Sequence, residues 1–371
     1  MESKQATSPG PFTALALEIM DLASKLDEQL ASQGREPTSS WVDTLESLLA
    51  EINATREEFV NKTHDAKRLA LGVSGTLSEL GYQFTDEMTL RAIYDFRLAQ
   101  HVAQASKLDA MMVERIRRQA MTNRTFSEAA DSPPGRVVDT AISRLLATNS
   151  DAFDAVGMIV HDLVPICGRL NDTLRAQRGL SVDQRNEPTQ AATALVHGAG
   201  STMFEVLGRD AAREARFGAG MRYFVRGASW DASYLVNEPV WSAVDLPGPV
   251  ASGAEALPHA LSSRAVFEAH DFFEPQTRRG VDVFLLRYVL HNWSDKYALR
   301  ILRALVPGMK HGTRVVINEF ALVDGPESRL LRKQPRNLDL VMSVAWNSLE
   351  RTVAMWKEFI EAPEGSMLGV I

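Results

Sequence analysis

A histidine and a glutamate lie near the ends of two strand-like runs in this sequence. His291 follows the apolar run of residues 281–286, and Glu319 lies in the β-branched run of residues 315–322, with a helical stretch between the runs. Strand, helix, strand is the unit of a parallel α/β sheet, in which ligands bind beyond the carboxyl ends of the strands. A general base and its carboxylate partner would be placed there, because a histidine can take a proton from a substrate near neutral pH. The alternative is a histidine that packs in the core or caps a helix after the strand.

Alternating strands and helices are predicted to position these residues. The expected strands are 240–244, 265–269, 281–286 and 313–322, and the expected helices are 253–261, 296–309, 336–348 and 350–360. Apolar spacing before residue 240 predicts helices instead, at 12–30, 41–52, 55–71, 89–102, 109–122, 140–146, 153–174, 193–196, 203–207 and 211–224. A short strand pair around Pro133, Pro134 and Gly135 follows two of these helices, which suggests a winged-helix arrangement. The first helices either pack on the body of the protein or form a dimer interface.

Composition excludes several classes of protein. The chain has 371 residues, which suits two domains, and a net charge of −7, which gives no reason to expect nucleic acid as a partner. A basic cluster at 115–118 is expected to be a solvated helix face, with DNA contact as the alternative. The single cysteine, Cys167, allows no disulfide within the chain and fits a reducing compartment. Without a secretory signal or a run of 18 apolar residues, the protein is expected to be cytoplasmic and to have no membrane span.

Four segments resemble one known family. AVFEAHDFFEP, VDVFLLRYVLHNWSD, LRILRALVPGMKHGTRVVINEFALVDG and LDLVMSVAWNSLERT are similar to the fungal and plant-type O-methyltransferases, class I enzymes that depend on S-adenosylmethionine. The resemblance covers residues 85–371. It implies a Rossmann-like α/β methyltransferase domain preceded by a mostly α-helical, winged-helix-like dimerisation domain, and hence a homodimer. The expected division is a helical extension (1–84), the winged-helix-like region (85–150), a helical region near the substrate pocket (151–235) and the methyltransferase domain (236–371).

The resemblance also implies roles for individual residues. His291 would remove the proton of an aromatic or polyketide-type hydroxyl, and Glu319 and Glu350 would flank and orient its imidazole. The cofactor-binding positions would be Asp245, Asp271, Phe272 and Arg287, and the acceptor-lining positions would be Met158, His161, Met342 and Trp346. No metal is expected.

The sequence departs from the family at the cofactor motif. Members of the family have a strand that ends in a glycine turn, then a helix, and then the strand with the ribose-binding aspartate. Here the run 241–244 leads directly into Asp245, and the glycines at 198–200 and 218–220 are expected to end helices. One strand and one helix are therefore predicted to be missing, and S-adenosylmethionine binding is predicted to be weak or absent. Two explanations stay open: an altered relative that works as a cofactor-independent cyclase, pericyclase or inactive dimer partner, and an incomplete translation of an ordinary methyltransferase gene.

Overall fold

The computed structural model divides the chain into two compact units. The described residues are 9–33, 50–103, 116, 118–128, 137–224, 241–245, 247–257, 259, 262–263, 265–327 and 329–361. The first unit comprises 1–161, 219–230 and 328–334, and the second comprises 162–218, 231–327 and 335–371. Each unit has a hydrophobic core of its own. The four-part division expected from the sequence stays a prediction.

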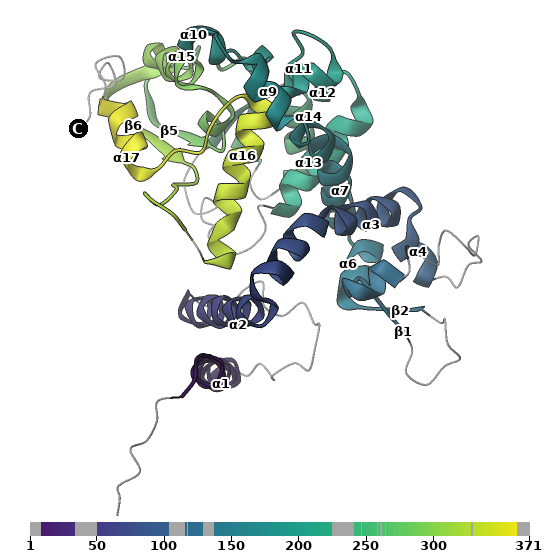
Figure 1. The fold of residues 1–371 in the computed structure, drawn as a ribbon. Coiled ribbons are helices and arrows are strands. Elements are labelled where there is room, and N and C mark those ends of the chain that lie inside the picture. Colours follow the sequence, from purple (N-terminus) through teal and green to yellow (C-terminus); the bar gives the residue numbers. More distant parts are fainter. Residues whose placement is uncertain are drawn as a thin grey trace, which may run out of the picture. The chain divides into compact units, whose positions relative to one another are not determined.

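Two long helices begin the first unit (Figure 1). They are α1 (Pro11–Ser32) and α2 (Ala50–Tyr82), and they contact each other along their length. The helix predicted at 12–30 is confirmed, and the one predicted at 55–71 continues through a kink at Gly72, whose φ of 64° suits a residue without a Cβ atom. The helix predicted at 41–52 lies mostly outside the described residues.

These two helices keep many apolar side chains on their surface. None of the residues of α1 is buried, although its spacing is amphipathic. Val73, just beyond the kink of α2, is 89% exposed. The other large exposed apolar side chains of the pair are Phe12, Leu17, Met20, Leu69, Leu71, Leu77, Leu80 and Tyr82. The pair alone therefore does not bury the apolar surface that its sequence provides.

Short helices and a strand pair complete the first unit. They are α3 (Phe84–Asp95), α4 (Leu98–Ala103), the antiparallel strands β1 (Phe126–Glu128) and β2 (Val137–Asp139), α6 (Ala141–Thr148), α7 (Ser150–Gly157) and the turn η8 (Leu330–Lys333). The predicted helix 89–102 is divided at Arg97, where φ is 49°. The predicted helix 109–122 lies largely outside the described residues. Ile93, Leu98 and Phe126 meet in the core of this part.

The predicted single helix 153–174 is wrong. The chain forms α7, the π-helical turn η1 (Met158–Leu163), α8 (Val164–Cys167) and α9 (Leu170–Ala176). Pro165 lies in the first turn of α8, where its missing N–H costs least, and it cannot continue the hydrogen-bond ladder of a preceding helix. The apolar spacing was correct for helical structure but not for one straight helix.

Four helices and a 3-10 turn continue the second unit up to its strands. They are α10 (Val182–Arg185), η2 (Pro188–Gln190), α11 (Ala192–His197), α12 (Met203–Gly208) and α13 (Ala211–Phe224), whose last residues belong to the first unit. The helix α10 lies between the expected helices 153–174 and 193–196, where no element was predicted. Met203, Leu207 and Ile166 pack against Met342 and Trp346 in one buried core.

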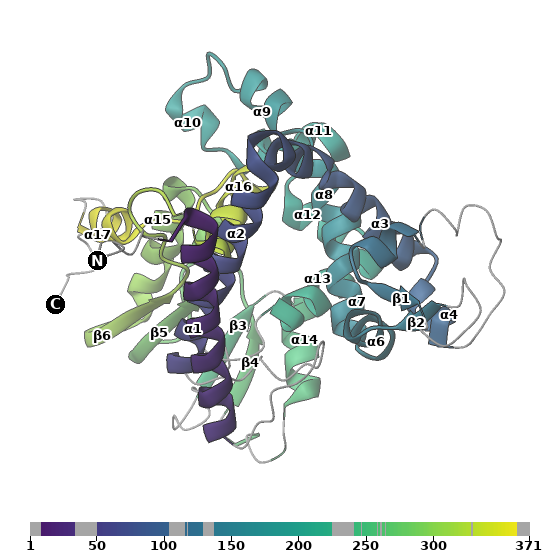
Figure 2. The same ribbon diagram turned by 60° about the horizontal axis from the view of Figure 1, so that its bottom comes forward.

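Four parallel strands form two separate pairs in the second unit. They are β3 (Trp241–Asp245) with β4 (Ala265–Ala269), and β5 (Val281–Arg287) with β6 (Met309–Asn318), as Figure 2 shows. The remaining elements are α14 (Pro247–Ala256), η6 (Leu290–Asn292), α15 (Asp295–Leu305), η7 (Val306–Gly308), α16 (Gln334–Trp346) and α17 (Val353–Glu361). Within the described residues, no strand joins the β3–β4 pair to the β5–β6 pair. The predicted strands are confirmed, with β6 placed four residues earlier than expected.

Helix α15 closes the core next to β5. Its apolar side chains Ala298, Ile301, Leu302 and Leu305 pack with Leu286 of β5 and with Phe359 of α17. This packing fixes the segment between β5 and α15, which contains His291. Along the described part of the chain, no helix is long and apolar enough to cross a membrane.

Candidate active site

The register of β5 and β6 brings two segments to the same sheet edge. Arg287, the last residue of β5, lies opposite Asn318, the last residue of β6. The chain then turns at Tyr288, whose φ of 51° is rare for a side chain of this size, and reaches His291 in the 3-10 turn η6. Glu319 follows β6 directly. His291 and Glu319 therefore lie beyond the carboxyl ends of neighbouring parallel strands, where the sequence predicted them.

Glu350 makes the direct contact with the imidazole. Its Oε1 atom lies 2.7 Å from Nδ1 of His291, and the two side chains are 0% and 10% exposed. An ionised carboxylate can only accept, so Nδ1 donates and Nε2 carries the lone pair that can take a proton. The predicted helix 350–360 begins later, at Val353, and leaves Glu350 in the preceding segment. There its N–H donates to Oδ1 of Asp339 at 2.9 Å.

Glu319 binds the backbone before His291, whereas Glu350 binds the imidazole. Its Oε1 atom accepts the backbone N–H groups of Val289 and Leu290 at 2.9 and 2.8 Å. Its Oε2 atom lies 3.9 Å from Nδ1 of His291 and is buried without a hydrogen bond in the described structure. Glu319 thus holds the backbone of the turn before His291 and adds negative charge near the imidazole.

The proton affinity of His291 reflects these neighbours. Burial lowers the pKa of His291, but its hydrogen bonds to Glu350 and to the Tyr288 backbone, together with the charges of Glu319 and Glu350, outweigh burial and raise the pKa above its ordinary value. Burial also raises the pKa of the Glu319 carboxyl and raises that of the Tyr288 hydroxyl to about 12. The imidazole therefore holds a proton to a higher pH than an exposed histidine does.

An aromatic cluster continues from the base toward α16. Trp293 packs on Phe273 with ring centroids 4.7 Å apart and stacks on Phe204 at 5.9 Å. Phe204 in turn meets Trp346 at 6.2 Å. The indole Nε1 of Trp346 is buried without a hydrogen-bond acceptor in the described structure. No role for Trp293 was predicted from the sequence, although it lies two residues after His291.

The expected cofactor positions lie at the carboxyl ends of three strands. Asp245 ends β3 opposite Ala269, Asp271 and Phe272 follow β4, and Arg287 ends β5. Asp271 is exposed, and its Oδ1 accepts the N–H of Phe273 at 2.9 Å, which leaves Oδ2 for a ligand hydroxyl or amine. The half-buried Phe272 ring packs against Phe273 and Trp293, with ring centroids 5.0 and 6.1 Å apart. The role of these residues in binding the cofactor stays a prediction.

The glycines do not form a cofactor turn in the described residues. Gly198 caps the end of α11 with a φ of 109°, as predicted. The stretch 218–220 lies inside α13, so the prediction that it ends a helix is wrong. Residues 225–240, which precede β3, lie outside the described structure. The missing glycine turn therefore stays a prediction.

The four expected acceptor residues fall in different units. Met342 and Trp346 are buried on α16 in the second unit, at 5% and 6% exposure. Met158 and His161 belong to the first unit, where Nε2 of His161 lies 2.5 Å from Oδ1 of Asp95. The role of all four in acceptor binding stays a prediction. The described residues contain no cluster of His, Cys, Asp or Glu side chains that could hold a metal ion.

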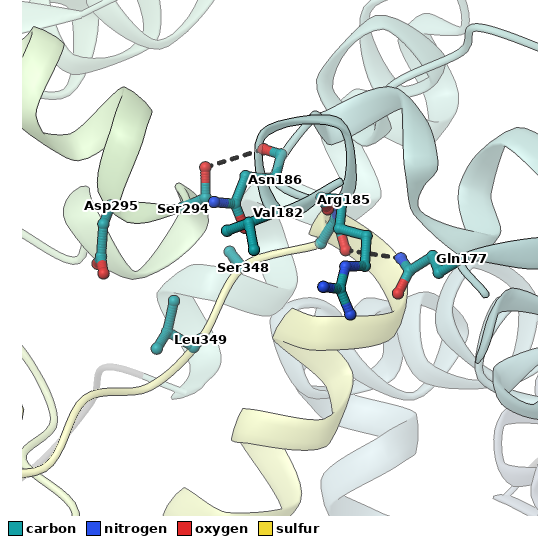
Figure 3. A pocket seen from close by; sticks show the side chains of 9 residues that line it. Gln177, Val182, Arg185, Asn186, Ser294, Asp295, Ser348 and Leu349 are labelled. Atoms are coloured by element: carbon teal, nitrogen blue, oxygen red, sulfur yellow. Dashed lines mark hydrogen bonds between the residues drawn. The ribbon is translucent and has the colours of Figure 1, made fainter. Parts of the chain in front are cut away.

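A polar hollow of about 450 Å³ lies between the segments 177–186, 294–295 and 347–349 (Figure 3). It is lined by Gln177, Val182, Arg185, Asn186, Ser294, Asp295, Asn347, Ser348 and Leu349. Several of its polar groups bond to each other: Ser294 Oγ donates to the Asn186 carbonyl at 2.9 Å, and Gln177 Nε2 donates to Asn347 Oδ1 at 3.1 Å. His291 and Glu350 do not line it, so it is distinct from the proton-accepting site.

Comparisons with known proteins converge on one kind of domain. Residues 238–364 match the O-methyltransferase domain model. The O-methyltransferase AMT9 of Alternaria alternata is 29% identical over 84% of this chain and 81% of its own length. The chlorophenol O-methyltransferase of Trichoderma longibrachiatum is 26% identical over 97% of this chain and 87% of its own length.

Solved structures share the fold. The structure of a pericyclic reaction enzyme has a TM-score of 0.70 at 17% identity, and the match covers 93% of this chain and 92% of that one. The structure of LepI with SAM has a TM-score of 0.69 at 18% identity, with the same coverage. OxaC in complex with sinefungin and meleagrin has a TM-score of 0.65 at 15% identity and covers 92% of each chain.

Proposed function

We propose that this chain, which belongs to the O-methyltransferase family, transfers a methyl group from S-adenosylmethionine to a hydroxyl group of an aromatic or polyketide-type small molecule in secondary metabolism. The observation that carries the proposal is the buried contact of 2.7 Å between His291 Nδ1 and Glu350 Oε1, which leaves Nε2 to act as a base. A phenol has a pKa of about 10, so its attack on a methyl group near neutral pH needs a group that accepts its proton.

The residues of this chain divide the task. Nε2 of His291 takes the hydroxyl proton, and the Glu350 carboxylate stabilises the imidazolium that forms. Glu319 keeps the turn before His291 in place through its two backbone hydrogen bonds. The Tyr288 ring lies against one side of the base, with its centroid 5.7 Å from that of the imidazole. When bound, the cofactor supplies an electrophilic methyl group on a positively charged sulfur.

Turnover with and without the cofactor tests the proposal. Incubation with phenolic and enolic acceptors should give products one methyl group heavier, detected by mass spectrometry, when S-adenosylmethionine is present. Products that form equally in its absence would favour a second candidate, a cofactor-independent cyclase or pericyclase. The raised pKa of His291 supports that candidate, because a retained proton can be donated to a substrate carbonyl.

Binding of S-adenosylmethionine is expected to be weak, because the sequence has no glycine turn of the family type before the strand that ends at Asp245. Methyl transfer then rises with cofactor concentration without saturating in the micromolar range. Calorimetric titration measures this directly, and a micromolar Kd would contradict the expectation. The variant Asp271→Asn should weaken the binding further, whereas Asp282→Asn, at an exposed position of β5, should leave it unchanged.

We also propose that the chain is a homodimer and that the first unit is its winged-helix-like dimerisation part. The antiparallel pair β1–β2 beside α4 and α6 supports the winged arrangement, and the exposed apolar side chains of α1 and α2 support an interface. Size-exclusion chromatography with light scattering should give twice the mass of the chain. A monomer at all concentrations would contradict the homodimer. It would also contradict a third candidate function, in which the chain is an inactive dimer partner of an active relative.

A further inference from the structure

Arg351 is a charged side chain that is almost completely buried, at 1% exposure. It directly follows Glu350, the residue that contacts His291. A buried guanidinium costs free energy unless hydrogen bonds and a counter-charge compensate for the lost water. Arg351 has both, and all of these partners lie around the turn that carries His291.

The guanidinium of Arg351 binds backbone carbonyls that come before and after His291 in the chain. Its Nη1 donates to the Leu290 carbonyl at 3.2 Å, and its Nη2 donates to the Trp293 carbonyl at 3.1 Å. Its Nε and Nη2 also donate to Oδ1 of Asp295, at 3.0 and 2.6 Å. One planar group therefore binds the residue before His291, a residue after it, and the first residue of α15.

The same guanidinium also packs on two aromatic rings of α17. Its central carbon lies 4.8 Å from the ring centre of Trp356 and 5.0 Å from that of Phe359, both on α17. The backbone of this segment is fixed too, because the Arg351 carbonyl accepts the N–H of Leu322 at 3.0 Å. Both the side chain and the backbone of Arg351 are thus anchored by hydrogen bonds, next to Glu350 in the chain.

We propose that Arg351 is a positioning residue, which holds the turn carrying His291 at the distance where Glu350 accepts the Nδ1 proton. The proposal deepens the proposed function and takes from it the role of His291 as base. A shift of about 1 Å in such a contact can cost about 10²-fold in rate. Lysine cannot replace the planar fork, because its single nitrogen cannot reach two carbonyls and a carboxylate in one plane.

The charged and titratable groups that face His291 come from several segments. Glu350 precedes α17, Glu319 follows β6, and the Tyr288 ring lies 5.7 Å from the imidazole. Asp339 on α16 holds the backbone of Glu350, and Asp295 is paired with Arg351 itself. If Arg351 acts through position, loosening it lengthens the Glu350 contact and lowers the proton affinity of His291.

The experiment is an NMR titration of the His291 imidazole, assigned by comparison with His291→Ala. In Arg351→Met the titration midpoint should fall by about one pH unit. Arg351→Lys should give a smaller fall. With an acceptor and cofactor, kcat should be about 10- to 100-fold lower at an almost unchanged KM. Arg314→Met, at an exposed position of β6, is the matched control and should behave as the unchanged protein.

Two results would overturn the proposal. One is an Arg351→Met protein with unchanged circular dichroism and an unchanged His291 midpoint. If Arg351→Met does not fold, Asp295→Asn replaces it, because this change weakens the ion pair of Arg351 at a half-exposed carboxylate. The second overturning result would be an unchanged His291 midpoint in both Asp295→Asn and Arg351→Lys. The titration needs no turnover. It can therefore be interpreted even if the protein does not transfer methyl groups.

Discussion

Replacing His291 by alanine is expected to lower kcat/KM for methyl transfer by about 10²- to 10⁴-fold, which is the usual contribution of a general base. The physical reason is the loss of the group that accepts the hydroxyl proton. Nδ1 of the imidazole is bound to Glu350, and Oε2 of Glu319 lies 3.9 Å from the same nitrogen, so Nε2 is the nitrogen that acts as the base. The measurement is the initial rate over a range of acceptor concentrations.

The control for this variant is His311→Ala, which removes an exposed imidazole from β6 in the same unit. Its rate should match that of the unchanged protein. Calorimetry should give the same cofactor affinity for both variants, because the expected cofactor positions do not include His291. A His291→Ala protein with an undiminished rate would show that the base is another residue.

The strand ends could be read from the sequence because their signals are local. A β-branched run such as 281–286 predicts a strand without reference to the rest of the chain, and parallel pairing then places its carboxyl end beside that of the next strand. His291 and Glu319 therefore lie where expected, on the turns beyond β5 and β6.

Other features of the site depend on contacts that no local pattern encodes. Glu350 was expected at the start of a helix, but it lies before α17 and bonds to a histidine 59 positions earlier in the chain. Arg351 is a charged residue by type, and nothing near it in the sequence indicates that it is 1% exposed. The same limit explains the division of helix 153–174, where the π-helical turn at Met158–Leu163 keeps the apolar spacing and changes the hydrogen bonds.

The predicted loss of a strand stays a prediction, because residues 225–240 lie outside the described structure. Parallel sheets are normally continuous and covered on both faces. In the described residues, β3 pairs with β4 and β5 pairs with β6, and no strand links the two pairs. The expected cofactor positions Asp245 and Asp271 belong to one pair, and Arg287 and the base belong to the other. A low affinity for the cofactor would follow if its binding residues are divided between two separate strand pairs. The binding titration and the rate measurements are therefore both needed.

The second large effect is expected for Glu350→Gln. The hydrogen bond and charge of Glu350 raise the pKa of His291, so their loss lowers it. The base works when it is unprotonated, and its unprotonated fraction rises with pH, reaching one half at the pKa and approaching one above it. In the unchanged protein the rate should therefore rise with pH to a midpoint above the ordinary histidine value of about 6.5, and in Glu350→Gln the rise should end at a lower pH.

The plateau of that profile should nevertheless fall by about 10²- to 10⁴-fold, because glutamine can turn its amide N–H₂ toward Nδ1. The imidazole would then carry its proton on Nε2, where it cannot accept one from the acceptor hydroxyl. Glu358→Gln, at an exposed position of α17, removes the same charge without touching the imidazole and should leave the profile unchanged. A Glu350→Gln profile with the same midpoint and plateau would show that the 2.7 Å contact does not control the base. A lower plateau with an unmoved midpoint would assign Glu350 an orienting role without the electrostatic one.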